Sequence, residues 1–161
     1  MLTSPWIAAL AALFLWWFST GAILMAVRRA DREGPEARLW AVLMNLPFLV
    51  LGAFAFVDTL GEASVAGVYI AFLSALALWG WVELAFLTGI ITGPVRRPLK
   101  GDEPEWERFI RAWGTIAYHE MLLVAVLIAM GLLAYNAENA FGFWTFAVLF
   151  AARISAKLNL Y

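Results

Sequence analysis

Residues 112–134 read AWGTIAYHEMLLVAVLIAMGLLA, an apolar run that Tyr118-His119-Glu120 interrupts about a third of the way along. A helix that crosses a bilayer needs about 20 mostly apolar residues, so this run is long enough to span a membrane. His119 is the only histidine of the chain. Ionisable residues inside hydrocarbon are costly and usually face the protein interior rather than lipid. The fold must therefore provide His119 and Glu120 with polar neighbours or with a ligand.

The composition of the whole chain is typical of a polytopic membrane protein. Of its 161 residues, 64% are hydrophobic and 14% are charged, whereas soluble domains have about half apolar and about a quarter charged residues. The chain contains no cysteine, which excludes disulfides and thiolate metal sites. No basic residue precedes the first apolar run, and this run is longer than the apolar core of a secretory signal peptide. We therefore do not expect a signal peptide.

Five apolar runs separated by polar segments predict an all-α membrane bundle of about five transmembrane helices, forming a single domain over residues 1–161. Pro5 suits the first turn of a helix. Residues 30–38 are highly charged and predict a loop, and Asn45-Leu46-Pro47 predicts a kink. Thr92-Gly93-Pro94 resists continuation of the third helix. The predicted spans are about 6–27, 39–57, 64–91, 112–134 and 140–159.

The positions of the basic residues predict the orientation of this bundle. All 11 lysines and arginines fall in the loop after the first span, in the loop after the third, or around the end of the fifth. The opposite loops carry only Asp58, Glu62 and Glu138. Because basic loops stay on the cytoplasmic side, we predict a periplasmic N-terminus and a cytoplasmic C-terminus.

Polar side chains of four predicted helices lie at a similar depth in the cytoplasmic half of the membrane. At about 1.5 Å per residue, Glu83 lies about 12 Å, His119 about 10 Å and Asn45 about 9 Å from that side. Arg153 has a similar depth, and Glu120 is slightly deeper. An isolated charge there costs about 2.5–3.5 kcal/mol, so we expect Arg153 to pair with Glu83 or Glu120. The predicted polar layer comprises Asn45, Glu83, His119, Glu120 and Arg153.

Small residues at a spacing of four favour close packing of helices. One such stripe comprises Gly67, Ala71 and Ala75, and another comprises Ala147, Ala151 and Ser155.

Three interpretations of the polar layer are open. It could be a structural cluster that fixes helix register. Alternatively, His119 could be the axial ligand of a pigment or haem, through a free ring nitrogen. In the third interpretation, Glu83, His119 and Glu120 bind iron, manganese or zinc, although a di-iron bundle site usually has four carboxylates and two histidines. One layer is too short for a proton path. We find no nucleophile triad, phosphate loop or nucleic-acid patch, so no catalytic residue is assigned.

Three strings of residues are distinctive: WGWVELAFLTGIITGP at 79–94, Tyr118-His119-Glu120, and SAKLNL at 155–160. They resemble the PuhE family of photosynthetic complex assembly proteins from anoxygenic phototrophic bacteria. Family members continue past the last string, whereas this sequence ends at Tyr161, so it is either a shortened relative or lacks the C-terminal part. The candidate site residues in the matching strings are Glu83, His119, Glu120, Lys157 and Asn159.

The resemblance implies a multi-pass protein of the bacterial inner (intracytoplasmic) membrane. Such a protein would be a non-enzymatic factor for assembly of the reaction centre and light-harvesting complex, or for modulation of bacteriochlorophyll production. Its partners would be membrane lipids and either reaction centre and light-harvesting subunits or pigment-synthesis proteins, and it would hold bacteriochlorophyll or haem near His119. The alternative is a metal-dependent enzyme of bacteriochlorophyll metabolism with Glu83, His119 and Glu120 as ligands.

Overall fold

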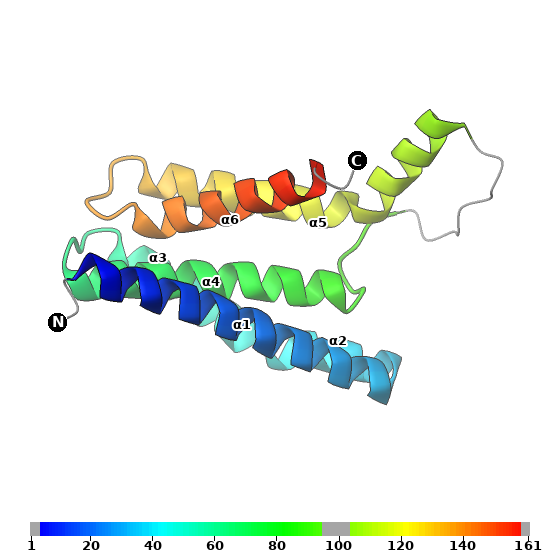
Figure 1. The fold of residues 1–161 in the computed structure, drawn as a ribbon, viewed down its shortest axis with the longest axis horizontal. Helices are drawn as coiled ribbons and strands as arrows, with labels where there is room; N and C mark the ends of the chain where they lie inside the picture. Colours follow the sequence, from blue (N-terminus) through cyan, green and yellow to red (C-terminus); the bar gives the residue numbers. More distant parts are fainter. Residues whose placement is uncertain (1–3, 95–103, 159–161) are drawn as a thin grey trace.

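The computed structural model of the chain describes residues 4–94 and 104–158, which form helices and turns without any strand. In Figure 1 the helices lie roughly side by side along the long axis of the molecule. Helix α4 is the centre of the bundle, because it contacts α1, α2, α3, α5 and α6. The helices are α1 (Pro5–Glu33), α2 (Pro35–Met44), α3 (Leu46–Thr59), α4 (Val65–Leu87), α5 (Glu105–Ala134) and α6 (Phe141–Leu158).

Helix α1 continues through residues for which the sequence predicts a loop. It extends to Glu33, and the side chain of Arg29 donates a 2.9 Å hydrogen bond to Glu33 one turn later. Oppositely charged residues at this spacing support a helix. Gly34 then reverses the chain with a φ of 104°, which favours glycine, and α2 begins directly at Pro35. The turn is therefore one residue long rather than the predicted nine over residues 30–38.

The break between α2 and α3 lies at Asn45, where the sequence predicts a kink. Pro47 has no N–H for a helical hydrogen bond, so backbone carbonyls near it need other donors. The Asn45 side chain donates to the carbonyl of Ala41 at 2.8 Å. The indole N–H of Trp81, on α4, donates to the carbonyl of Val42 at 3.2 Å. The side chain of a neighbouring helix thus stabilises the broken segment.

Small residues let α4 pack closely against its neighbours. Ala71 and Ala75 of the predicted stripe are almost fully buried. A Cβ added to Gly142 of α6 would lie 3.0 Å from the carbonyl oxygen of Ala71. On α3, a Cβ added to Gly52 would lie 2.9 Å from the Cβ of Ala77. Helix α4 ends at Leu87, four residues before the predicted end.

Within residues 4–94 and 104–158, four helical segments are long and apolar enough to cross a membrane. The apolar helix at the position of the predicted fifth span, Phe141–Ala156, is shorter than these four. Large apolar side chains such as Trp6, Phe54 and Leu132 are strongly exposed on the outside of the bundle, as lipid-facing residues would be. The four spanning segments are Pro5–Glu33, Pro35–Thr59, Val65–Leu87 and Trp113–Ala134.

Two regions hold α6 and its preceding turn on the rest of the bundle. At the end of the molecule that carries the N-terminus in Figure 1, Asn139 links the α5–α6 turn to the α3–α4 turn. Its backbone N–H donates to Leu60 and its side-chain amide donates to the carbonyl of Glu62, both at 3.0 Å. The other region lies nearer the opposite end and contains the predicted polar residues.

Candidate functional site

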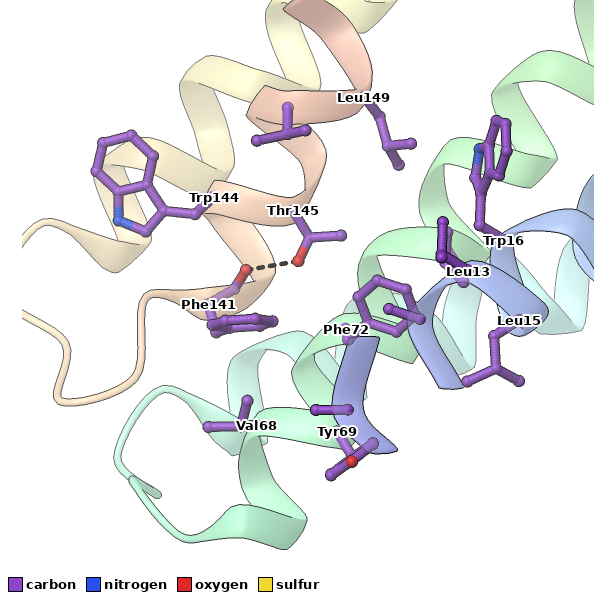
Figure 2. A pocket seen from close by; sticks show the side chains of 14 residues that line it. Leu13, Leu15, Trp16, Val68, Tyr69, Phe72, Phe141, Trp144, Thr145 and Leu149 are labelled. Atoms are coloured by element: carbon purple, nitrogen blue, oxygen red, sulfur yellow. Dashed lines mark hydrogen bonds between the residues drawn. The ribbon is translucent and has the colours of Figure 1, made fainter. Parts of the chain in front are cut away.

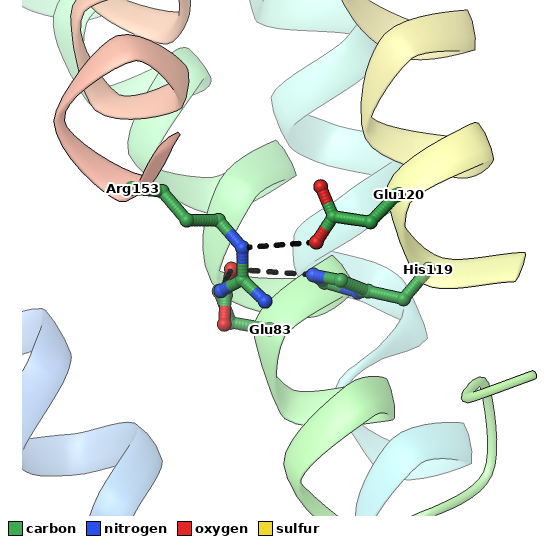
Figure 3. A network of polar contacts seen from close by, with 4 residues as sticks. All are labelled: Glu83, His119, Glu120 and Arg153. Atoms are coloured by element: carbon green, nitrogen blue, oxygen red, sulfur yellow. Dashed lines mark hydrogen bonds and ion pairs between the residues drawn. The ribbon is translucent and has the colours of Figure 1, made fainter. Parts of the chain in front are cut away.

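The guanidinium of Arg153 joins three helices in a network of polar contacts (Figure 3). From α6, its Nη1 donates to Oε1 of Glu83 on α4 at 2.6 Å. Its Nε donates to Oε1 of Glu120 on α5 at 3.4 Å. The three side chains are only 13–16% exposed. Charge-assisted hydrogen bonds of this kind are stronger than neutral ones, and here they join helices that are distant in sequence.

His119 borders this network and is completely buried. Its Nε2 lies 3.6 Å from Oε1 of Glu83, which is too long for a hydrogen bond. Neither of its ring nitrogens has a hydrogen-bond partner among the described residues. Its ring stacks on Phe86, with the ring centroids 4.2 Å apart and an interplanar angle of 27°. The side chain is thus held by packing rather than by hydrogen bonds.

Phe86 is part of the site, although it is not among the predicted site residues. It lies three residues after Glu83 on α4, so the two side chains share a face. The guanidinium carbon of Arg153 lies 5.2 Å from the centre of the Phe86 ring, within the range of a cation–π contact. This spacing of three from a membrane carboxylate is the signal that could have identified it.

The segment after α4 positions His119 on α5. The backbone N–H of His119 donates to the carbonyl of Thr92 at 3.0 Å. The next residue, Gly93, lies directly against the backbone of Gly114 and Thr115, where an added Cβ would collide with the carbonyl oxygen of Gly114. The Thr92-Gly93 segment therefore lies against α5 one turn before the site.

The structure brings together four of the five residues of the predicted polar layer. Glu83, His119, Glu120 and Arg153 meet at the network, whereas Asn45 uses its side chain to bond Ala41 on its own helix. Of the other two candidates, the backbone of Lys157 belongs to the end of α6, and Asn159 lies outside the described residues.

In the structure the four residues contact one another and Phe86. Both carboxylates already bond the guanidinium of Arg153, which occupies the position that a shared metal ion would take. Among the described residues, no group of three or more histidine, aspartate or glutamate side chains could hold a metal ion. An axial ligand must offer an open ring nitrogen, but His119 has no exposed surface and Phe86 covers one face of its ring.

The helices and the network define a helical membrane protein in which one partly buried arginine joins α4, α5 and α6. The chain belongs to the family described as protein of unknown function (DUF3623), whose model matches residues 2–161. It is 48% identical over 160 residues to a Rhodobacter capsulatus protein described as an uncharacterized 30.4 kDa protein in the puhA 5′ region. That match covers 99% of this chain and 58% of the relative, so the chain spans little more than half of the relative's length. No solved structure matches the chain.

Proposed function

We propose that this chain is a non-enzymatic membrane factor for assembly of the photosynthetic reaction centre and light-harvesting complex. The relative in the puhA region belongs to a photosynthesis gene cluster, which supports a role in photosynthesis. The resemblance of residues 79–94 and 155–160 to the PuhE family supports the same role. A location in the bacterial inner (intracytoplasmic) membrane follows from this proposal.

The observation that carries the non-enzymatic assignment is the pairing of both membrane carboxylates with Arg153. An enzyme with a metal at Glu83, His119 and Glu120 would first have to displace the guanidinium, which lies 2.6 Å from Glu83. Displacement would leave a buried cation without its partners, which is strongly unfavourable. A scaffold needs only a fixed arrangement of helices, and the network supplies it.

The first experiment compares assembled complexes with total pigment in a phototrophic bacterium from which the gene has been deleted. We expect the absorbance bands of the reaction centre and light-harvesting complex to fall further than total bacteriochlorophyll extracted from the same cells. The wild-type gene and the Arg29→Ala variant should both restore the bands, whereas Arg153→Ala should not. An equal fall of pigment and complexes would instead indicate modulation of bacteriochlorophyll production, and unchanged bands would overturn the proposal.

A second measurement separates the scaffold from the enzyme. We expect protein purified in detergent from its phototrophic host to contain no stoichiometric iron, manganese or zinc, and no Soret or near-infrared band. A stoichiometric metal that disappears in His119→Ala would replace the proposal by the metal-dependent enzyme. A chromophore that is lost in the same variant would assign His119 a bacteriochlorophyll or haem instead.

We further infer a five-span topology with a periplasmic N-terminus. Helix α6 has 18 residues, which extend about 27 Å against a hydrocarbon core of about 30 Å. The α1–α2 turn, the start of α5 and the end of α6 all lie in the right-hand half of the molecule in Figure 1, which agrees with the distribution of basic residues. A reporter that works only in the cytoplasm should be active when it is fused after Tyr161, and a reporter that works only in the periplasm should be inactive there. Activity of the periplasmic reporter would overturn this topology.

A further inference from the structure

Helices α1 and α6 flank α4 and leave an apolar groove along it. Figure 2 shows the half of this groove near the N-terminus, where α1, α4 and α6 surround a cavity of about 430 Å³. A second cavity of about 520 Å³ continues toward Glu83 and Arg153. Trp16, Leu76 and Leu149 line both cavities, so the two are consecutive sections of one groove.

The dimensions of the second cavity fit one hydrocarbon chain. It follows α4 from Leu76 to Leu87, about 16 Å at 1.5 Å per residue, which is about half of a hydrocarbon core of about 30 Å. Spread over this length, a volume of about 520 Å³ makes a narrow channel, into which a single hydrocarbon chain fits lengthwise.

The polar groups of this cavity leave one donor region available to a ligand. The hydroxyls of Ser19 and Thr20 donate to the carbonyl of Trp16 at 2.9 and 2.8 Å, so they need no further partner. Arg153 has five N–H donors, and its bonds to the two carboxylates use two of them. Arg153 lines the cavity, so its remaining donors suit an oxygen acceptor there, such as a lipid ester.

Two arginines follow the cavity at the end of α1. Arg28 lies one turn beyond Leu24, which lines the cavity, and Arg32 lies one turn further on. Both are exposed, and neither forms an ion pair with another described residue. Arg29, by contrast, pairs with Glu33 at 2.9 Å. The end of the groove thus presents positive charge, which attracts the phosphate of an anionic lipid.

We propose that this second cavity binds one tail of an anionic phospholipid, with the phosphate at Arg28 and Arg32 and the glycerol esters near Arg153. The lipid belongs to the leaflet on whose side these arginines lie. The tail covers the face of the Glu83–Arg153 pair that the helices leave open. This site is independent of the assembly role, because it requires only that the chain lies in a membrane.

The test is native mass spectrometry of the full chain released from nanodiscs that contain equal amounts of phosphatidylglycerol and phosphatidylcholine. We expect one retained lipid per chain, with phosphatidylglycerol favoured about tenfold because two arginines attract its charge. In the Arg28→Gln/Arg32→Gln variant, a lipid should still be retained, but this preference should disappear.

A matched pair of variants tests whether the groove holds the tail. Ala152 and its neighbour Ala151 are both exposed, but Ala152 lines the second cavity, whereas Ala151 lies outside both sections of the groove. Ala152→Phe should abolish retention of both lipids, and Ala151→Phe should leave it unchanged. Thermal melting in detergent serves to establish that both variants are folded.

Four outcomes would overturn the proposal. The first is the absence of any retained lipid, and the second is equal retention of lipid by the folded Ala152→Phe and Ala151→Phe variants. The third is a pigment-sized adduct in place of phospholipid in protein from a phototrophic host. The fourth is a dimer that Ala152→Phe disrupts, because it would show that a second copy of the chain occupies the groove.

Discussion

At the scale of single residues, one cation serves two carboxylates that come from different helices. Arg153 bonds Glu83 and Glu120, and Phe86 packs against both the guanidinium and the ring of His119. Removing one partner of a buried ion pair is more harmful than removing both, because the other charge is left without compensation. The stability of the molecule should therefore depend on Arg153 far more than on other arginines.

Arg153→Ala should reduce the free energy of unfolding by about 3–5 kcal/mol, because it leaves two membrane carboxylates without a cation. The measurement is equilibrium unfolding in detergent micelles. Arg29→Ala is the matched control: its ion pair with Glu33 is 2.9 Å long, but the two side chains are 81% and 53% exposed. That exposed pair should contribute about 0–1 kcal/mol. A similar loss of unfolding free energy in Arg153→Ala and Arg29→Ala would contradict the structural role of the network.

His119 should tolerate an aromatic replacement better than a small one. Its ring is buried against Phe86, and its nitrogens have no hydrogen-bond partner among the described residues. His119→Phe should change the unfolding free energy by less than about 1.5 kcal/mol, because it keeps a flat ring stacked on Phe86 and adds only one ring atom. His119→Ala should cost about 2–4 kcal/mol through the cavity it creates. Thermal melting of both variants in detergent provides the comparison, and equal destabilisation would point to a polar role for the imidazole.

That Glu83, Glu120 and Arg153 lie at one level of the bundle could be predicted from the sequence, but the direction of each side chain around its helix could not. Counting residues from the membrane surface put Asn45 at the level of Glu83 and Arg153, yet Asn45 turns back onto the carbonyl of Ala41. A helix break frees carbonyls locally, and a nearby amide satisfies one of them. Phe86 could not be predicted as a site residue from composition, because the chain has twelve phenylalanines and composition does not distinguish one that contacts polar groups from one that faces lipid.

At the scale of helices, close packing depends on glycines at particular contacts. Gly142→Ala should destabilise the protein by about 1–3 kcal/mol, because overpacking forces helices apart. An added Cβ there would lie 2.8 Å from the ring of Phe56 and 3.0 Å from the carbonyl of Ala71.

Gly21 supplies the control for this substitution. An added Cβ at Gly21 of α1 meets nothing within 4 Å, so Gly21→Ala should be neutral or stabilise by up to about 1 kcal/mol through helix propensity. Chemical unfolding of both variants tests the difference. If Gly142→Ala changed the unfolding free energy as little as Gly21→Ala, α6 would be able to shift and make room for the added Cβ.

The existence of the helices could be predicted more reliably than their ends. Hydropathy locates apolar runs, but it treats the charged residues after Val27 as a loop, whereas arginine, alanine and glutamate all favour a helix and α1 continues to Glu33. Helix α4 ends before the Gly93-Pro94 signal because Gly89 adopts a φ of 78°. A glycine inside an apolar run does not reveal whether it takes this conformation.

At the scale of the whole molecule, two distant regions fasten the α5–α6 pair to the first four helices. One is the Arg153 network, and the other is Asn139 at the opposite end of α6. Asn139 is 5% exposed; its amide donates to the carbonyl of Glu62, and its side-chain oxygen accepts from the N–H of Phe141. The hydrogen bonds of one residue thus both start α6 and attach its turn to the turn before α4.

Asn139→Ala should reduce the unfolding free energy by about 1–3 kcal/mol, because buried backbone groups lose their partners. Asn136→Ala is the matched control, since Asn136 is exposed in the same turn, and its effect should stay within about 0.5 kcal/mol. Hydrogen exchange of the two turns would localise the effect. Equal exchange in both variants would argue against a link between the turns.

The position of Arg153 in α6 also concerns the order in which the protein is made. Synthesis delivers Glu83 first, then His119 and Glu120, and the guanidinium only afterwards. Until α6 enters the membrane, each carboxylate carries an insertion penalty of about 2.5–3.5 kcal/mol. Chains that stop after Asn139 should therefore be degraded faster than the full chain in pulse–chase labelling. Changing Glu83 and Glu120 to glutamine should reduce the difference in degradation rate between the shortened and the full chain. Arg153 would then stabilise only those chains whose synthesis has reached α6.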